Sequence, residues 1–232
     1  MKGKAARSPA PRRLSREIRT LAERGPQSAL GICKIAAGTV FLAQLFVTSA
    51  VAVQDGPVDF AELTQSLREF QEKPSPETAA GVRALLPREG RIKFDDSAQS
   101  RAAREALDDA LPVLEDQVEA ADRDGIRLAL NLRAVTDAPI SESLDAILGR
   151  LITTDATVFL QELLRWKTQL TPRTLGQLVG TLGKEYAEQD RAAVCAEIRR
   201  RIDALLAVSE AALTEARDQC VKELRQKRPK CG

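Results

Sequence analysis

Apolar residues recur at helical spacing along most of this chain, and this periodicity constrains the fold more than any other feature. Leu63, Leu67 and Phe70 stand at positions i, i+4 and i+7, which places them on one face of a helix. Spacings of three and four continue from Asp59 almost to the C-terminus. Aromatic residues make up only 3% of the sequence, so the core must be aliphatic and the strand-favouring aromatics are nearly absent. The sequence therefore predicts an all-α protein.

Capping and turn residues divide this helical stretch into segments. Ser75-Pro76 predicts a helix start, with the serine as N-cap and the proline at the first helical position. Residues 87–96 lack periodicity and predict one flexible loop, while Pro112 should kink or split a long helix that begins after Ser97. Further turns or helix starts are predicted at Asp124-Gly125, Asp137 to Ser141, Thr154-Asp155 and Thr171-Pro172, the last opening a helix through Tyr186.

The helices expected between residues 124 and 187 are short and joined by tight turns. In this they resemble the α-α repeats of HEAT-like solenoids. The stretches Leu144–Leu151 and Leu175–Leu182 can be overlaid as LDAILGRL and LGQLVGTL. An irregular helical bundle explains the pattern equally well. We therefore expect either an irregular bundle or a short HEAT-like α-α repeat array.

An uninterrupted apolar stripe lies near the C-terminus, and neither Gly nor Pro occurs within residues 184–228. Its members are Cys195, Ile198, Ile202, Leu205, Ser209, Leu213, Ala216, Cys220 and Leu224. Because the register is unbroken, we predict one long C-terminal helix from about residue 188 to residue 227. The alternative is a helical hairpin that turns near Ala207-Val208.

The cysteines separate these two alternatives. In one long helix Cys195 and Cys220 would lie about 37 Å apart, too far for a disulfide. Cys220 is then expected to pair with Cys231, behind the turn at Pro229. A hairpin would instead bring Cys195 opposite Cys220.

The N-terminal segment has the order of an export signal. Residues 1–34 form a basic leader with nine basic and two acidic residues, a net charge of +7. Residues 35–53 follow without any charge, and Ala50 and Ala52 give the small-x-small pattern of a signal-peptidase site. We predict a cleaved signal peptide and a periplasmic or secreted bacterial-type protein.

Two other interpretations of residues 35–53 stay open. About 20 apolar residues span a bilayer, so the segment is alternatively an inner-membrane anchor for a periplasmic domain. The third interpretation is a buried core helix. In either exported form, residues 54–232 make a single all-α extracytoplasmic domain.

Composition excludes several kinds of chemistry. The chain has no histidine, which rules out a Ser-His-Asp or Cys-His site within it and removes the commonest metal ligand. No CxxC spacing occurs, and we predict neither a metal nor a cofactor. Removing the charges of residues 1–34 from the totals of 35 basic and 33 acidic residues leaves 26 and 31. A body with a net charge of −5 gives no electrostatic footprint for nucleic acid.

Glu142-Ser143 is the one dipeptide with a catalytic parallel. It resembles the Glu-Ser pair of helical lytic transglycosylases, in which the glutamate is a lone general acid. The Gly-Leu-Met-Gln stretch of that family is missing. An acid in the first turn of a helix also stabilises the helix dipole. Glu142 is thus the weak catalytic candidate of an alternative function, a cell-envelope hydrolase that uses carboxylates only.

The function we predict is non-enzymatic: binding an envelope protein that the sequence does not identify, or scaffolding in the cell envelope. The interface is expected on the helices between Ile126 and Tyr186. This region holds the chain's only tryptophan and only tyrosine, Trp166 and Tyr186, and both residue types are enriched at interface anchors. The alternative for Trp166 is a core position beside Phe159 and Leu163.

Overall fold

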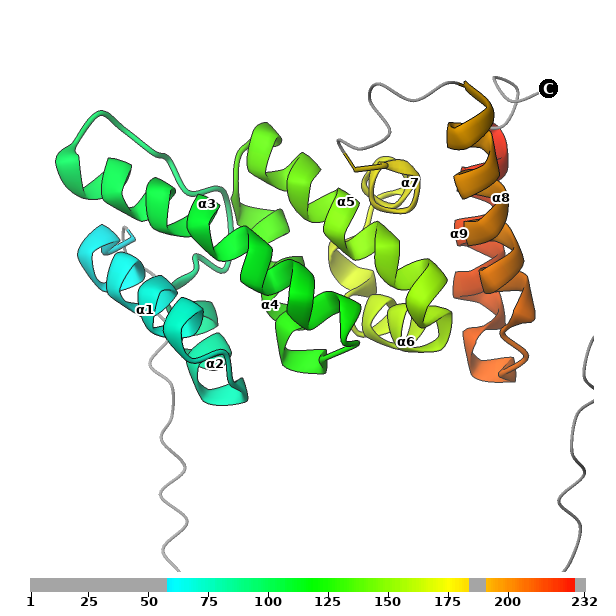
Figure 1. Cartoon of the computed structure of the whole chain (residues 1–232), viewed down its shortest axis with the longest axis horizontal. Coiled ribbons are helices and arrows are strands. Elements are labelled where there is room, and N and C mark those ends of the chain that lie inside the picture. The colour runs from blue at the N-terminus through cyan, green and yellow to red at the C-terminus, as the bar shows by residue number, and fades with distance from the viewer. Residues whose placement is uncertain (1–57, 184–190, 228–232) are drawn as a thin grey trace, which may run out of the picture. The chain divides into compact units, whose positions relative to one another are not determined.

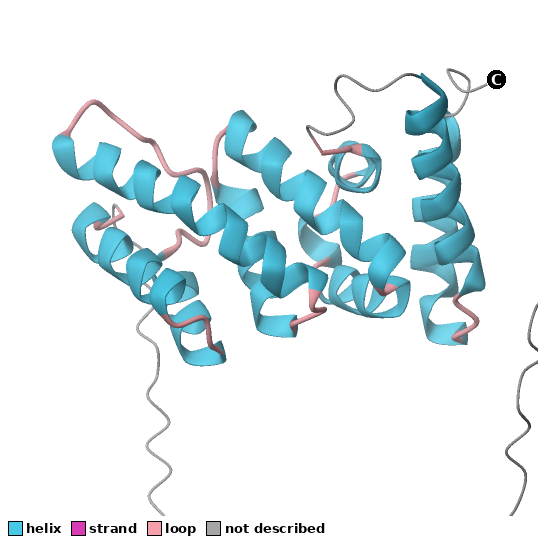
Figure 2. Ribbon diagram, in the orientation of Figure 1, coloured by secondary structure: helices cyan, strands magenta, loops and turns pink. Residues whose placement is uncertain are grey.

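The computed structural model describes residues 58–183 and 191–227, all within the compact unit Ser49–Gly232. Every regular element in these two ranges is a helix, so the all-α prediction is confirmed (Figure 2). Among the described helices, none combines the length and the hydropathy needed to cross a membrane. The predicted signal segment with Ala50 and Ala52, together with Tyr186 and Cys231, lies outside the described residues.

The elements follow one another along the chain with short connections (Figure 1). They are α1 (Phe60–Glu72), α2 (Pro76–Leu85), α3 (Ala98–Glu119), α4 (Arg123–Val135), α5 (Ala138–Thr154), α6 (Ala156–Arg165), η1 (Lys167–Gln169), α7 (Pro172–Gly180), α8 (Arg191–Ala207), η3 (Ala211–Leu213) and α9 (Thr214–Lys227).

The predicted helix starts are confirmed at several caps. Ser75 forms a capping box with Thr78, and Ser97 accepts a hydrogen bond from the Ser100 N–H. Asp155 ends α5 and also caps α6, because its carboxylate accepts from the Val158 N–H at 3.0 Å. Side-chain oxygens at these positions satisfy N–H groups that have no partner inside the helix.

The helices from α1 to α7 pack in two rows. In one row α1 contacts α3, α3 contacts α5 and α5 contacts α7, while in the other α2 contacts α4 and α4 contacts α6. The rows join where α1 packs on α2, α3 on α4 and α5 on α6. These helices range from nine to 22 residues, so the architecture is an irregular two-row bundle.

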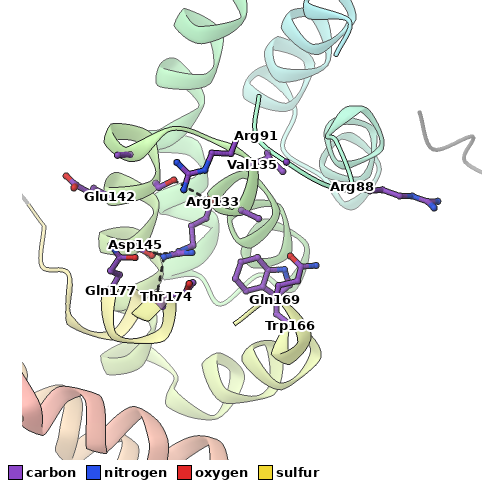
Figure 3. Close-up of a pocket in the computed structure, with 14 residues that line it drawn as sticks. Arg88, Arg91, Arg133, Val135, Glu142, Asp145, Trp166, Gln169, Thr174 and Gln177 are labelled. Carbon is purple, nitrogen blue, oxygen red and sulfur yellow. Dashed lines mark hydrogen bonds and ion pairs between the residues drawn. The ribbon is translucent and has the colours of Figure 1, made fainter. Parts of the chain in front are cut away.

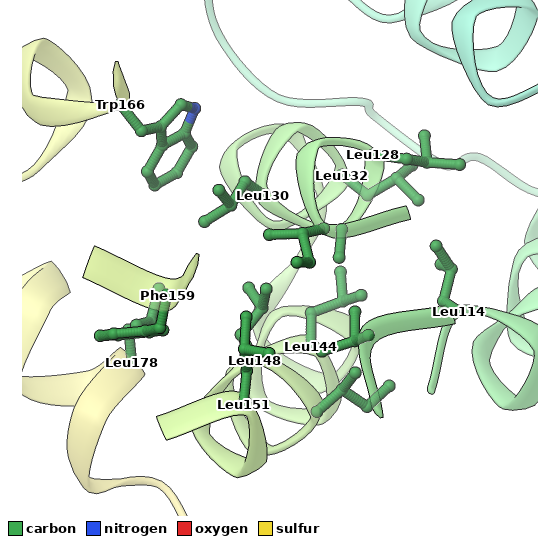
Figure 4. Packing of buried hydrophobic residues seen from close by; sticks show 14 of the residues in the cluster. Leu114, Leu128, Leu130, Leu132, Leu144, Leu148, Leu151, Phe159, Trp166 and Leu178 are labelled. Carbon is green, nitrogen blue, oxygen red and sulfur yellow. The ribbon is translucent and has the colours of Figure 1, made fainter. Parts of the chain in front are cut away.

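Leucines dominate the contact between the rows. Leu114 from α3, Leu128 and Leu132 from α4, and Leu144 and Leu148 from α5 are at most 1% exposed (Figure 4). Burying one such side chain contributes roughly 1.5–3 kcal/mol. The aliphatic core expected from composition is therefore what holds the rows together.

The turn between α3 and α4 lies earlier than Asp124-Gly125, where the sequence pattern placed it. The chain reverses at Ala121, which has a φ of 55°, and Asp122 then caps α4 by accepting from the Asp124 and Gly125 N–H groups. Gly125 is needed for close packing, because a Cβ there would lie 2.6 Å from Gln117 Cβ. Pro112 lies inside α3 without splitting it.

The prediction of one long C-terminal helix is wrong, and the hairpin alternative is the observed structure. Helix α8 ends at Ala207, α9 begins at Thr214, and the two helices pack on each other. Arg217 Nη1 donates to the Val208 carbonyl at 2.9 Å across the turn. Both arms bury their part of the stripe, so periodicity alone did not reveal the reversal.

Both predicted pairings of Cys220 are contradicted, because Cys220 is a free and fully buried thiol. Cys195 is disulfide-bonded, and its partner lies outside the described residues. Six residues separate Ala207 from the start of α9, which shifts the two arms relative to each other. Measured along the helix axes, Cys195 lies about 18 Å from the turn and Cys220 about 9 Å. The two sulfur atoms therefore do not face each other.

Candidate functional site

A cavity of about 440 Å³ lies between the loop 87–96 and the helices α4, α5 and α7, with η1 at one side (Figure 3). We call it the arginine pocket. The residues that give it its chemistry are Arg91, Arg133, Glu142, Asp145, Trp166 and Gln169.

The short connection between α4 and α5 builds one wall of the pocket. Asp137 is the N-cap of α5, so the predicted start at Ser141 is corrected to Ala138. Ser141 instead lies in the first turn, where its hydroxyl lies 3.2 Å from the carbonyls of Arg133 and Thr136 and shares its one proton between them. These carbonyls have no partner inside α4, and the serine satisfies them.

The loop 87–96 is held against this wall. The Ile92 N–H donates to the Val135 carbonyl at 2.7 Å, and the Ile92 side chain is buried. Phe94 stacks on Phe60 of α1, with a distance of 5.8 Å between ring centroids. Arg104 lies over the ring of Phe94. These contacts fix the position of Arg91 at the rim of the pocket.

A buried ion pair forms the floor. Arg133 of α4 is 9% exposed and Asp145 of α5 is 2% exposed. The Arg133 Nε donates to one carboxylate oxygen, and Nη2 donates to the other at 3.1 Å. Nη2 also lies 3.5 Å from the Thr174 carbonyl at the start of α7. Such a bidentate pair neutralises two charges that would be costly to bury alone.

The Nη1 group of Arg133 makes no hydrogen bond within the described part of the chain. It therefore remains a donor on a side chain whose position is already fixed by Asp145. A guanidinium held in this way loses little further rotamer entropy when it donates to a ligand.

Trp166 supplies a second donor. It is the residue that ends α6, it is 8% exposed, and its Nε1 is buried without a hydrogen-bond partner among the described residues. The nitrogen lies on the edge of the ring that faces away from Phe159 (Figure 4), and Gln169 of the pocket lies beside the indole (Figure 3). An unpaired buried donor costs about 1–3 kcal/mol.

Arg91 and Glu142 both line the pocket outside the buried pair. Both are exposed, and neither has an ion pair within the described residues. Figure 3 shows the Arg91 side chain extending over Arg133, whereas Arg88 points away from the pocket. Glu142 lies across Arg133 from Trp166 in the same view.

The pocket thus brings together two residues that the sequence singled out, Trp166 and Glu142. Trp166 also packs on the core, as the alternative interpretation proposed. Asp145 is the carboxylate nearest along the helix to Glu142, and it is paired with Arg133. Glu142 itself is exposed and makes no hydrogen bond within the described residues.

Sequence reasoning missed Arg91 and Arg133. The signal for Arg133 was present: it stands four residues after Ala129 and seven after Ile126, on the buried face of α4. A charged residue within an apolar stripe predicts a buried partner. Arg91 gave no signal, because its placement depends on the contact between the loop and α4.

A second charged cluster lies between α4 and α6. Glu162 is 1% exposed and accepts from Arg123 Nη1 at 2.8 Å and Arg127 Nε at 2.9 Å, while Arg165 Nη1 lies 3.3 Å away. Burial alone would raise the pKa of this carboxyl, but the hydrogen bonds from Arg127 and Arg123 outweigh burial and the pKa is lowered. Both oxygens have partners, so the cluster joins the two helices.

Within residues 58–183 and 191–227, no group of cysteine and acidic side chains is arranged to hold a metal ion. No protein-family model, curated protein or solved structure matches this chain.

Proposed function

We propose that this chain is an exported, non-enzymatic helical protein that binds another protein in the cell envelope. The observation that carries the proposal is the arginine pocket, where Arg133 Nη1 makes no hydrogen bond and Arg91 makes no ion pair within the described residues. Fixed donors on a concave surface favour a bound group that accepts hydrogen bonds.

The chemistry of the pocket supports binding over hydrolysis. Its fixed groups, Trp166 Nε1 and Arg133 Nη1, are hydrogen-bond donors with no acceptor capacity. A carboxylate-only hydrolase needs a protonated carboxyl placed against the scissile bond. Glu142 is exposed and Asp145 is paired with Arg133, so neither carboxyl has the setting of a general acid.

The N-terminal pattern of residues 1–53 supports the location. A basic leader, an uncharged apolar segment and Ala50-x-Ala52 is the order of an export signal, and the all-α body follows it.

Site-specific photo-crosslinking in intact cells tests partner binding. A photoreactive phenylalanine replaces Gln169, which is exposed at the pocket, or Arg68 on α1, which is exposed and outside the pocket. We expect a discrete crosslinked species from position 169, absent from position 68 and lost when R91Q is added. Equal crosslinking from both positions, or none from position 169, contradicts the proposal.

A further inference from the structure

Cys195 is disulfide-bonded, and the other cysteines of the chain identify its partner. They are Cys33, Cys220 and Cys231. Cys220 is excluded, because it is a free and fully buried thiol. Cys33 precedes the predicted cleavage after Ala52, so an exported mature chain lacks it. We propose that Cys195 is bonded to Cys231, and that this bond fastens the C-terminal tail to the start of α8.

The exclusion of Cys33 rests on the proposed export, whereas the geometry of the C-terminal hairpin supports Cys231 independently. Helix α8 runs toward the turn and α9 runs back from it, so the start of α8 and the end of α9 lie at the same end of the hairpin (Figure 1). Measured along the helix axes, Cys195 lies about 18 Å from Ala207, and Lys227 lies about 20 Å from Thr214. The last residue of α9 is therefore level with Cys195.

Four residues lead from Lys227 to Cys231, and they are enough to cross between the two helices. An extended chain advances about 3.3–3.6 Å per residue, which gives a reach of about 13–14 Å. The axes of packed helices are about 8–10 Å apart, and a disulfide needs Cα atoms about 4.4–6.8 Å apart. Pro229 has no N–H with which to extend α9 along its axis, which favours a tail that turns toward α8.

The helix ends that the bond would join are fixed by packing. Cys195 is 5% exposed and continues the buried stripe of Ile198 and Ile202 on α8. Leu224, in the last turn of α9, is fully buried. The bond closes a loop from residue 195 to residue 231 that contains the whole hairpin, so it restricts the unfolded chain and opposes separation of the two arms.

Forming the bond requires an oxidant, which by chemical class is another disulfide. The two cysteine thiols lose two protons and two electrons as the S–S bond forms, and a disulfide such as oxidised glutathione accepts them and becomes two thiols. The exchange proceeds through thiolates, and burial raises the pKa of the Cys220 thiol to about 12. Cys220 therefore does not compete for either cysteine in the folded chain.

Peptide mapping of the full chain tests the pairing. The protein is equilibrated with a glutathione redox buffer, free thiols are blocked with N-ethylmaleimide in urea at slightly acidic pH, and trypsin then cleaves after lysine and arginine. Peptide 192–199 should be linked to the dipeptide Cys231-Gly232, and peptide 218–222 should carry the block. A link from peptide 192–199 to peptide 218–222 or to peptide 25–34, or N-ethylmaleimide on peptide 192–199, overturns the proposal.

The variant C231S gives a second test, because residue 231 lies beyond the last residue of α9 and its substitution leaves the core unchanged. In oxidised protein C231S should lower the urea midpoint of unfolding by roughly 1 M or more. In dithiothreitol the midpoints of wild type and C231S should agree, since neither chain then has the bond. The control K230Q changes the adjacent residue without removing a thiol, and it should match wild type in both conditions.

Equal midpoints for oxidised wild type and C231S, or a difference that persists in dithiothreitol, overturn the pairing. The pairing and the proposed location fail separately. A reporter that shows no export contradicts the location, whereas the peptide map alone decides which cysteine is bonded to Cys195.

Discussion

Glu162 shows what one buried carboxylate contributes to this chain. Three arginines surround it, and two of them come from the neighbouring helix α4. E162Q keeps the shape but removes the carboxylate charge from Arg123 and Arg165 and leaves Arg127 with Asp124. We expect the free energy of unfolding to fall by about 3 kcal/mol, the lower end for a broken buried pair, because the arginines are partly exposed. Urea unfolding measures the change, and E105Q, at an exposed position whose side chain makes no ion pair or hydrogen bond with another described residue, should stay within about 0.5 kcal/mol of wild type.

Glu162 should also make the free energy of unfolding depend on pH. The folded-state pKa of Glu162 lies below its ordinary value of 4.5, so its contribution to stability is present above that value. It is lost as the pH falls through the lowered pKa of the folded state. The difference in unfolding free energy between wild type and E162Q should therefore shrink below about pH 4.5. A difference that stays constant down to pH 3 would show that charge is not its cause.

Cys220 should be inert in the folded protein. Burial raises the pKa of its thiol to about 12, and the side chain is 0% exposed. The thiolate is the reactive form, so at pH 8 alkylation by iodoacetamide needs unfolding of α9. Peptide mapping by mass spectrometry should find Cys220 unlabelled in native protein and fully labelled in 8 M urea. Rapid labelling without denaturant would contradict the buried position.

At the scale of single residues, the sequence identified those pocket residues whose signal lies in the neighbouring sequence or in the composition. Trp166 was identified because the chain has one tryptophan, and Glu142 because it precedes a serine near a helix start. Arg91 and Arg133 line one pocket only because the loop 87–96 packs on α4. No local pattern contains that contact, and their convergence required the tertiary structure.

At the scale of helices, two glycines provide a matched test of how tightly the helices pack. Gly81 lies within α2, and a Cβ there would meet nothing within 4 Å. Gly149 of α5 lies against the buried Arg201, where a Cβ would be 2.6 Å from Nη1. That guanidinium cannot easily move, because Nη1 donates to the Val179 and Thr181 carbonyls at 2.8 and 3.0 Å.

We therefore expect opposite effects from the same substitution. G81A should raise the free energy of unfolding by about 0.5–1 kcal/mol, since alanine loses less backbone entropy in a helix. G149A should lower it by about 1–3 kcal/mol, because Arg201 must give up its contacts with α7. Both values come from chemical denaturation. Stabilisation by G149A would show that the contacts of Arg201 with α7 do not contribute to stability.

Helix starts were predictable from sequence, but the C-terminal reversal was not. Ser75 and Asp155 cap their helices through atoms a few residues away, so the local sequence contains the whole interaction. The turn after Ala207 has no glycine or proline, and both arms bury apolar residues at the same spacing. The reversal is favoured because the arms pack on each other and on α5, α6 and α7. Apolar residues spaced by three and four positions are compatible with one long helix and equally with two helices in which the spacing continues across the turn.

For the whole molecule, export is the prediction with the clearest measurement. A reporter active only in the periplasm, fused after residue 60, should be active because residues 35–53 follow a leader with a net charge of +7. Activity confined to the cytoplasm would contradict the prediction. N-terminal sequencing of the mature protein would then distinguish cleavage after Ala52 from a retained anchor.

The C-terminal hairpin also bears on how the bundle avoids polymerisation. Each helix pair in two packed rows buries one face on the next pair, so a terminal pair with an apolar outer face would recruit another copy. Here α8 and α9 cover α5, α6 and α7 and carry exposed charges that include Arg199, Lys222 and Arg225. In the described residues, Leu206 is the one large apolar side chain that is strongly exposed. The hairpin therefore makes growth at this end of the rows unfavourable.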